Sequence, residues 1–356
     1  MLTFGIEEEF FVVGPDGQLS HAGAEVVDAT EEDRGELQHE LTLSQAESAT
    51  EVCRTHGEAL DQLRTMRADL ARTAESHGYR LLPAACPPLP ETDLAEITPN
   101  PRYERMAVHY GATARTTLTC GCHVHVGIDD REEAIRVLGH VRPWLPVLLT
   151  VTANSAVADG YDTKYASWRY QQWTRWPSAG PPPLFASLDH YESIVDAWLR
   201  GGVILDRKMV YWDVRLSEKQ PTLEFRVADV AATPEEAVLL AVLVRGLVAV
   251  VLDIDAPPAE LSNEVLRGQL WRASREGLAG RCADPRTGDL APASEILQAL
   301  VELTAPHLEA AGDLDFAKEG LARLLEGGSG ADRQRRTFER GGRAEDVVNL
   351  LTGKNP

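Results

Sequence analysis

The chain has 356 residues, which is enough to bury a substantial core in one large domain or two modest ones. Its formal charge of −20, from 35 basic and 55 acidic residues, disfavours nucleic acid or an anionic membrane surface as a main partner. No run approaches the ~20 apolar residues of a membrane span. Five scattered cysteines indicate reduced thiols, and no signal-peptide pattern opens the chain, so we expect a cytoplasmic protein.

Residues 4–13 (FGIEEEFFVV) predict a β-strand, which the turn signal at 14–17 ends. Because strand side chains alternate between two faces, Glu7 and Glu9 should point together at a cation or a phosphate group. Glu8 should lie on the apolar face, where an unpaired charge is costly, so it needs a partner or an edge position. A solvated charge run fits poorly with these apolar neighbours.

Two further glutamates, Glu40 and Glu47, lie among small and apolar residues. They would share a face on a helix and oppose each other on an unbroken strand, and the pattern does not decide between the two. The elements expected next are a helix from 54 to 77, a strand from 79 to 85, a proline-rich loop from 87 to 101 and a helix from 102 to 116.

Residues 119–128 (TCGCHVHVGI) predict a strand with His123 and His125 on one face and both cysteines on the other. The glycines beside the histidines should leave room for a ligand, a metal or phosphates to approach the backbone. Structural zinc is an alternative, although alternation separates the cysteines from the histidines. Two histidines hydrogen-bonded within the core are another alternative.

Residues 132–152 predict a helix that Pro143 and Pro146 kink or divide. The residues that follow, up to 183, are rich in Trp, Tyr, Arg and Pro. This composition indicates either a binding loop or an aromatic cover for one end of the core.

Residues 210–216 and 221–229 predict a β-hairpin in which each arm has an apolar face and a polar face. The polar pairs are Asp213 with Arg215 and Glu224 with Arg226.

The last part of the chain predicts mainly helices. Thr233 is the expected N-cap of a buried helix, with Pro234 at its first position and Glu236 completing a capping box. The other expected elements are helices at 261–276 and 294–311, a flexible hinge at 327–330, and an arginine-rich stretch at 331–336 that either binds phosphate or begins a solvated helix. With no repeat or clear linker, we expect a single domain over 1–356.

Four strand-like segments therefore carry acids, histidines or arginines on one face. If these strands share one antiparallel sheet with helices behind it, their polar faces line a single concave surface. Three carboxylates and an imidazole would favour Mg²⁺ or Mn²⁺, and the arginines point to phosphate. No phosphate-binding loop or dinucleotide-binding motif is present, so the pattern predicts metal-assisted chemistry on a nucleotide at a sheet.

Several of these motifs, in this order, resemble the carboxylate–amine ligase (glutamate–cysteine ligase type 2) family over nearly the whole chain. The matching stretches are GIEEEF at 5–10, Glu40, Glu47, GCHVHVG at 121–127, ANS at 153–155, Asp162 and Thr163, Ser167, Arg169, WDVR at 212–215, TLEFR at 222–226 and GADRQR at 330–335. The resemblance implies an α+β fold, in which a glutamine-synthetase-like antiparallel sheet is curved into a half-barrel with helices packed on its convex side.

The resemblance also implies a reaction, in which ATP phosphorylates a carboxylate and an amine attacks the acyl phosphate to give an amide. The carboxylate donor would be L-glutamate through its γ-carboxylate, and the amine would be cysteine or another amino acid or amine. By the same resemblance, two or three Mg²⁺ ions would be held by Glu7, Glu9, Glu40, Glu47, His125 and Glu224.

The other implied roles are catalysis for Glu224 and Arg226, nucleotide binding for Arg226, Arg333 and Gln334, and substrate binding for His123, Asn154, Arg169 and Arg215. A homodimer is favoured. Two alternatives stay open: a zinc-dependent metallohydrolase that uses His123 and His125 without ATP, and a catalytically silent nucleotide- or small-molecule-binding protein.

Overall fold

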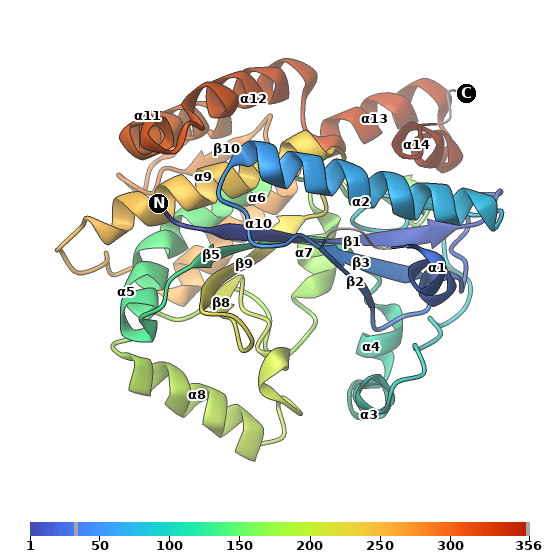
Figure 1. Cartoon of the computed structure of the whole chain (residues 1–356), viewed down its shortest axis with the longest axis horizontal. Coiled ribbons are helices and arrows are strands. Elements are labelled where there is room, and N and C mark those ends of the chain that lie inside the picture. The colour runs from blue at the N-terminus through green and yellow to red at the C-terminus, as the bar shows by residue number, and fades with distance from the viewer. Residues whose placement is uncertain (32–34, 354–356) are drawn as a thin grey trace.

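The computed structural model describes residues 1–31 and 35–353. Within these ranges the chain forms an α+β fold around a seven-stranded antiparallel sheet, in which six strands follow the order β2-β3-β1-β5-β9-β8 (Figure 1). The seventh strand, β4, pairs with the C-terminal end of β1. The strands of this sheet are β1 (Phe4–Val13), β2 (Glu36–His39), β3 (Gln45–Ala49), β4 (Arg80–Leu82), β5 (Gly121–Gly127), β8 (Val214–Leu216) and β9 (Thr222–Asp229). Two small separate sheets are formed by β6 (Val157–Ala158) with β7 (Tyr161–Asp162) and by β10 (Arg281–Ala283) with β11 (Leu290–Pro292).

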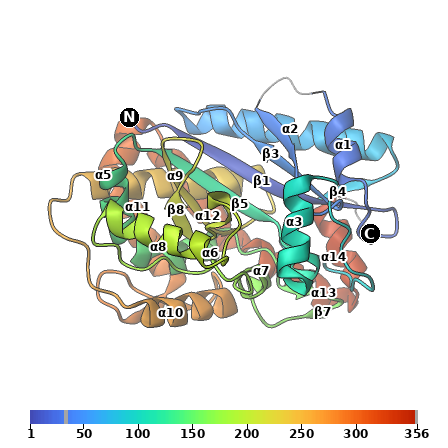
Figure 2. The same ribbon diagram turned by 90° about the horizontal axis from the view of Figure 1, so that it is seen from below.

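Helices cover one face of the sheet in two layers (Figure 1). Helices α2 and α9 lie against this face, and α11 and α12 pack on the outer side of α9. Helices α3, α4 and α8 lie on the opposite side, where β1 and β5 are visible between α8 and α3 (Figure 2). The helices are α1 (Gly23–Ala29), α2 (His56–Ser76), α3 (Pro101–Tyr110), α4 (Ala112–Thr116), α5 (Arg131–Val141), α6 (Leu145–Val151), α7 (Trp168–Trp173), α8 (Leu188–Arg200), α9 (Pro234–Leu252), α10 (Asn263–Glu276), α11 (Ala293–Ala311), α12 (Leu314–Gly327), α13 (Gly330–Gly341) and α14 (Ala344–Leu351), with short 3₁₀ helices η1 (Arg142–Trp144) and η2 (Arg207–Met209).

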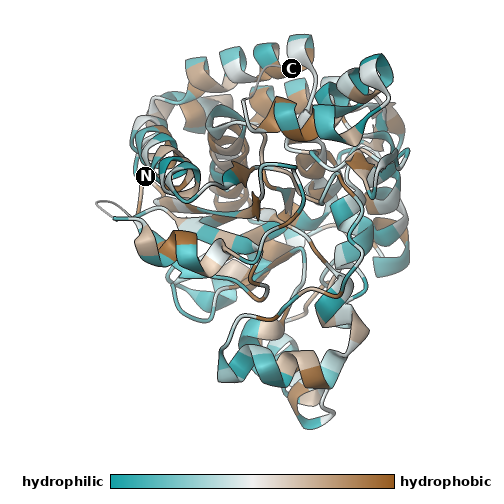
Figure 3. Ribbon diagram, turned by 90° about the vertical axis from the view of Figure 1, so that its right-hand side faces the viewer, coloured by the Kyte–Doolittle hydropathy of each residue, from teal (hydrophilic) through white to brown (hydrophobic). Residues whose placement is uncertain are grey.

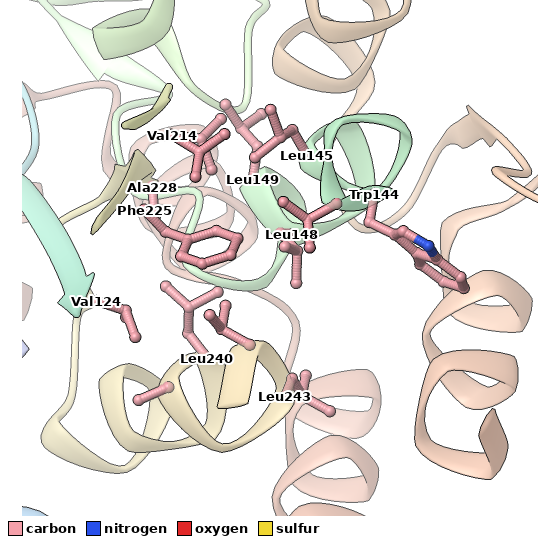
Figure 4. Close-up of a cluster of buried hydrophobic side chains, with 14 of the residues drawn as sticks. Val124, Trp144, Leu145, Leu148, Leu149, Val214, Phe225, Ala228, Leu240 and Leu243 are labelled. Atoms are coloured by element: carbon pink, nitrogen blue, oxygen red, sulfur yellow. The ribbon is translucent and has the colours of Figure 1, made fainter. Parts of the chain in front are cut away.

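The main core lies between the sheet and its covering helices. Figure 4 shows Val124 of β5 and Phe225 of β9 meeting Leu148 of α6 and Leu240 of α9, and all four side chains are buried. Burying one such side chain contributes roughly 1.5–3 kcal/mol, so this apolar side holds the sheet in place and leaves the other side free for polar groups.

Apolar residues gather where the layers face one another, while the outward turns of the helices are mostly hydrophilic (Figure 3). Helix α9 is buried along most of its length, as its sequence predicts. Among the described residues, no helix is both long enough and apolar enough to cross a membrane.

The strand at 4–13, the histidine strand and the second arm of the hairpin confirm the sequence analysis. The first arm is shorter than the predicted 210–216, because β8 covers only Val214–Leu216, and Asp213 is buried just before it. Glu8 lies on the apolar side and is paired with Arg67, whose Nε and Nη2 lie 2.8 and 2.5 Å from its carboxylate oxygens. The predicted need for a partner is thus met by an arginine from α2.

The structure of the segment around Glu40 and Glu47, which the sequence pattern left open, is a hairpin of β2 and β3. Other predictions need correction. The predicted helix at 102–116 is divided at Gly111, whose φ is 55°. Only half of the expected capping box forms at α9, because Thr233 accepts from the backbone N–H of Glu236 while the Glu236 carboxylate pairs with Arg333.

The expected hinge at 327–330 is a tight junction between α12 and α13, where Ser329 is fully buried and forms a capping box with Asp332. The arginine-rich stretch lies in α13. Helices α1, α8, α12 and α14 occupy segments that the sequence pattern left unassigned.

The alternation of side chains along the sequence also does not predict a change of register in β9. Cys122 of β5 faces Ala228 and Val124 faces Phe225, so three steps along β9 match two along β5. This β-bulge lies beside Arg226, and bulges of this kind redirect a side chain locally. As a result, Phe225 and Ala228 both reach the core in Figure 4.

Candidate active site

The register of the sheet places polar side chains in a row across four strands. Glu7 of β1 lies opposite His123 of β5, and His125 lies opposite Glu224 of β9, which in turn faces Arg215 of β8. Opposite residues in antiparallel strands have Cβ atoms about 5 Å apart, so these groups are close enough to interact. We call Glu7, His123, His125, Arg215, Glu224 and Arg226 the Glu224 cluster.

Glu7 lies between the two histidines. One of its carboxylate oxygens is 3.1 Å from His123 Nδ1, and the other is 3.2 Å from His125 Nε2. Burial alone would raise the pKa of Glu7, but the contacts with His123 and His125 outweigh burial and hold that pKa well below its usual range. His125 is itself oriented by Thr222, whose hydroxyl lies 2.9 Å from Nδ1.

Glu224 is a buried carboxylate held by two arginines. Arg215 donates to its two oxygens from Nε at 2.9 Å and from Nη2 at 3.0 Å, and Arg226 donates from Nη1. Burial raises the pKa of Glu224, but the charges of Arg215 and Arg226 lower it more, so the carboxylate stays ionised. The carbonyls of Lys208 and Val210 each accept a 2.7 Å hydrogen bond from Arg215 and fix its position.

One ligand atom from each of Glu7, His125 and Glu224 can be chosen so that all three lie within 4.8 Å of one another. Two carboxylates and one imidazole form a donor set that suits a hard divalent cation such as Mg²⁺ or Mn²⁺. The residues present therefore fit the metal that the sequence pattern predicts.

More carboxylates lie beside this set. Glu47 faces Glu9 in the β1–β3 register, and burial, followed by the charges of Glu7, Glu40 and Glu9, raises the pKa of Glu47 well above its usual range. Glu9 accepts a 2.6 Å hydrogen bond from the backbone N–H of Gly121. Carboxylates held this close repel one another unless a proton or a cation lies between them.

All of these groups line one cavity of about 530 Å³, which is within the usual range for a small-molecule site. The sequence-predicted residues on its wall are Glu7, Glu9, Glu40, Glu47, His123, His125, Arg215, Glu224 and Arg226. The structure thus brings together nine of the thirteen predicted site residues.

The cavity is also lined by cationic and aromatic residues that the sequence analysis did not assign to the site. They include Arg102, Tyr103, Trp173, Trp176, Lys208, Tyr211 and Lys219. One signal was available, because the chain has only five lysines and two of them lie here. The aromatic segment expected as a binding loop or a core cover serves as both, because Trp176 is 3% exposed and still borders the cavity.

Four predicted site residues, Asn154, Arg169, Arg333 and Gln334, do not line this cavity. Arg333 forms an ion pair of 2.7 Å with Glu236 on α9. The Asn154 amide donates to the carbonyls of Pro83 and Val230, and its oxygen accepts from Gln334.

Asn154 and Gln334 belong to a second polar cluster, around Asp229 at the end of β9. Asp229 accepts from the backbone N–H of Asn154 at 2.8 Å and from the hydroxyls of Ser155 and Ser167 at 2.8 and 2.7 Å. We call these five residues the Asp229 cluster. All of them are fully buried, so this cluster holds segments of the chain together without an open face.

Arg169 lies behind the cavity wall. A Cβ on Gly121 would lie 2.4 Å from Arg169 Nη2, so this glycine makes room for the arginine. At Gly127, a Cβ would instead meet the Thr3 hydroxyl. The expectation that the glycines leave space for a ligand is therefore wrong for Gly121, whereas Gly127 does line the cavity.

The structure also bears on the alternative of a structural zinc site. Cys120 and Cys122 are buried on the apolar side of β5, and all five cysteines are unpaired. The group of possible ligands found among the described residues contains His125 but neither His123 nor a cysteine. A structural zinc site of the predicted Cys–His composition is not formed.

Comparison with known proteins gives a consistent result over the whole chain. Residues 3–350 match the family described as glutamate–cysteine ligase family 2 (GCS2). The chain is 48% identical over 354 residues to "Putative glutamate–cysteine ligase 2-1" of Rhodococcus jostii (strain RHA1), covering 99% of this chain and 96% of that protein. It is 44% identical over 354 residues to "Putative glutamate–cysteine ligase 2-3" of Mycolicibacterium smegmatis, covering 98% and 97%.

Solved structures share the fold at much lower identity. A bifunctional glutathione synthetase from Pasteurella multocida has a TM-score of 0.72 at 16% identity, covering 99% of this chain and 52% of that one. Glutamate–cysteine ligase from Francisella tularensis, in complex with AMP, has a TM-score of 0.64 at 12% identity, covering 99% and 88%.

Proposed function

The chain belongs to glutamate–cysteine ligase family 2, a family of ATP-dependent carbon–nitrogen ligases, and on this premise we propose that it forms an amide from L-glutamate and an amine. The carboxylate donor in this proposal is the γ-carboxylate of L-glutamate, and the acceptor is cysteine or another amino acid or amine. The observation that carries it is the Glu224 cluster, in which a carboxylate–imidazole–carboxylate set and two arginines share one cavity wall.

The proposed reaction has two steps. The γ-phosphoryl group of ATP passes to a carboxylate oxygen of glutamate, which gives an acyl phosphate and ADP. The amine nitrogen then attacks the acyl carbon, the carbon–oxygen bond to phosphate breaks, and the nitrogen loses a proton. The products are an amide and inorganic phosphate.

Glu7, His125 and Glu224 would hold the first Mg²⁺ ion, and Glu9, Glu40 and Glu47 would contribute to further metal sites. Such ions, when bound, neutralise charge on the phosphates. The chain supplies the Glu7 and Glu224 carboxylates, whose pKa values lie below the usual range, and His123 supports Glu7 through its 3.1 Å contact.

Arg226 is proposed to stabilise the negative charge that develops on the transferred phosphoryl group. Its side chain is buried at the cavity wall, and its Nε donates to no other group among the described residues. Arg215 is proposed to act on substrate as well as on Glu224. The assignments of Arg169 and Asn154 to substrates, and of Arg333 and Gln334 to the nucleotide, stay predictions, since all four have other observed contacts.

We also propose that the sheet forms a glutamine-synthetase-like half-barrel, that residues 1–356 make one domain, and that the protein assembles as a homodimer. Analytical ultracentrifugation would decide the last point, because a monomeric sedimentation mass at micromolar concentration contradicts it.

The deciding experiment measures phosphate release from ATP and Mg²⁺ with L-glutamate, across a panel of amines that includes cysteine, with product masses recorded. We expect release that depends on both glutamate and one amine, together with the mass of the matching amide. Reactions without glutamate, without amine and with Glu224→Gln are the controls. Hydrolysis that needs zinc but no ATP would instead identify the metallohydrolase, and a folded protein that is silent with every pair would contradict the ligase.

A further inference from the structure

Arg226 is held at its edge by charged groups, and its guanidinium carbon lies over the faces of two aromatic rings. At the edge, Nη1 donates to Glu224 and lies 3.4 Å from His123 Nδ1. The guanidinium carbon is 5.7 Å from the centre of the Trp173 ring and 5.8 Å from that of Tyr211. The two rings are 4.8 Å apart and inclined at 48°, so they form a continuous aromatic wall.

We propose that Trp173 and Tyr211 form an aromatic clamp that fixes the plane of the Arg226 guanidinium for phosphoryl transfer. This inference rests on the proposed function, because it assigns a geometric task to the arginine that the ligase reaction uses. Trp173 and Tyr211 are positioning residues in this proposal, and Arg226 is the group that meets the phosphoryl oxygens.

The contacts at the edge of the guanidinium do not fix the orientation of its plane. Both edge contacts are made through Nη1, while Nε has no partner among the described residues, so the group can rotate about the bonded corner. An aromatic face attracts a cation through its quadrupole and favours a stacked arrangement. The clamp therefore restrains the rotation that the hydrogen bonds permit and leaves the remaining donors free.

The position of Trp173 is set by the helix that carries it. Ser167 caps α7 by accepting from the Tyr170 N–H, while its hydroxyl donates to Asp229. One turn before Trp173, Arg169 places its guanidinium 5.5 Å from the same indole ring and donates weakly, at 3.4 Å, to the Arg226 carbonyl. The Asp229 cluster, through Ser167, and Arg169 thus hold Trp173 in position.

The test compares Trp173→Leu, which removes the aromatic face, with Trp173→Phe, which keeps it. Trp168→Leu is the matched control, because Trp168 lies on the same helix and does not line the cavity. We expect Trp173→Leu to lower kcat by on the order of 10- to 100-fold, with the KM values for ATP and glutamate changed less than about twofold. Trp173→Phe should recover most of kcat, and Trp168→Leu should keep the wild-type value.

A raised KM with unchanged kcat would overturn the clamp, because it would mean that Trp173 contacts substrate directly. Equal losses in the Phe and Leu variants would overturn it too. If Trp173→Leu does not fold, Tyr211→Leu against Tyr211→Phe gives the same comparison on the second ring.

A second measurement separates the clamp from the proposed function. If the wild-type protein releases no phosphate with any amine, the ligase proposal fails, and a double-mutant cycle of Trp173→Leu with Arg226→Met in urea unfolding then tests the clamp without any activity. A favourable stacking contact makes the double variant less destabilised than the sum of the single variants. Additive effects, as expected for Trp168→Leu with Arg226→Met, would exclude the contact.

Discussion

Two buried carboxylates on the same strand have opposite surroundings. Glu224 and Asp229 lie five positions apart on β9, and each is at most 1% exposed. Glu224 is held by full positive charges, which lower its pKa, and it borders a cavity. Asp229 accepts its hydrogen bonds from neutral hydroxyl and N–H donors, and burial raises its pKa more than the nearby charge of Arg169 lowers it.

The two clusters also differ in what they leave unbonded. In the Glu224 cluster, His123 Nε2 and Arg226 Nε make no hydrogen bond to the described residues. In the Asp229 cluster, both carboxylate oxygens accept hydrogen bonds, and the Asn154 amide is bonded on both sides. Family-like motifs contribute to both clusters, but only the residues of the Glu224 cluster line the cavity.

The strongest way to break this comparison is Glu224→Gln, which keeps the side-chain shape and removes the charge. We expect ATP turnover to fall by at least on the order of 10²–10³-fold, because a metal ligand and the partner of two arginines is lost. Phosphate release measures the activity, and far-ultraviolet circular dichroism serves as the folding control. Normal turnover in a folded variant would refute the metal assignment.

Arg226→Lys should have the next largest effect. The lysine keeps the positive charge but replaces a planar fork with a single ammonium group, and it cannot stack in the same way on Trp173 and Tyr211. We expect kcat to fall by roughly 10²-fold. Steady-state kinetics with varied ATP would check this, and a variant with wild-type kcat would show that charge alone suffices.

A pH effect on stability should arise from Asp213, a buried carboxyl outside both clusters that accepts a 2.9 Å hydrogen bond from Tyr170. Burial raises its pKa from 3.8 to about 7, so the folded protein keeps the proton over a range where the unfolded chain loses it. Stability from this group is complete below about pH 4, falls as the pH rises to about 7, and is then constant, with a total loss of a few kcal/mol.

Asp213→Asn should remove this pH dependence. Urea unfolding at pH 4 to 8 measures it, and we expect the stability of the variant relative to the wild type to rise across that window. A constant difference between the two proteins would show that Asp213 is ionised in the folded state.

The smallest effect on activity is expected from Asn154→Ala, which changes the Asp229 cluster and leaves the Glu224 cluster intact. It removes hydrogen bonds to Pro83, Val230 and Gln334, so unfolding should become easier by about 1–3 kcal/mol. Turnover per folded molecule and KM should change less than about twofold. A large rise in KM for glutamate or the amine would instead restore Asn154 to the substrate site.

Much of the fold and the centre of the site could be predicted from local patterns. Alternation placed Glu7 and Glu9 on one face of β1 and His123 and His125 on one face of β5, because the pleat of a strand fixes which way each side chain points. The same rule predicted that Glu8 needs a partner. It could not name Arg67, which is 59 residues away.

Predictions failed where the outcome depended on contacts between distant segments. The hairpin of β2 and β3 brings Glu40 and Glu47 to one cavity, and spacing along the chain does not reveal such a turn. The bulge in β9 could not be predicted from its sequence, because β9 contains no glycine, which often marks a bulge. The bulge arises from the register in which β9 pairs with β5. A family resemblance could not separate Arg333 and Gln334 from the cavity residues, since motif order carries no distances.

The sequence by itself determined which residues can act together, because the alternation of side chains within a strand is a local property of the backbone. It also determined the family, through motifs along nearly the whole chain. Only the tertiary structure decided which motif residues share a cavity and which support it from behind. That division depends on strand register and on buried contacts such as Arg169 with Arg226, 57 residues apart, where packing rather than sequence spacing sets the distance.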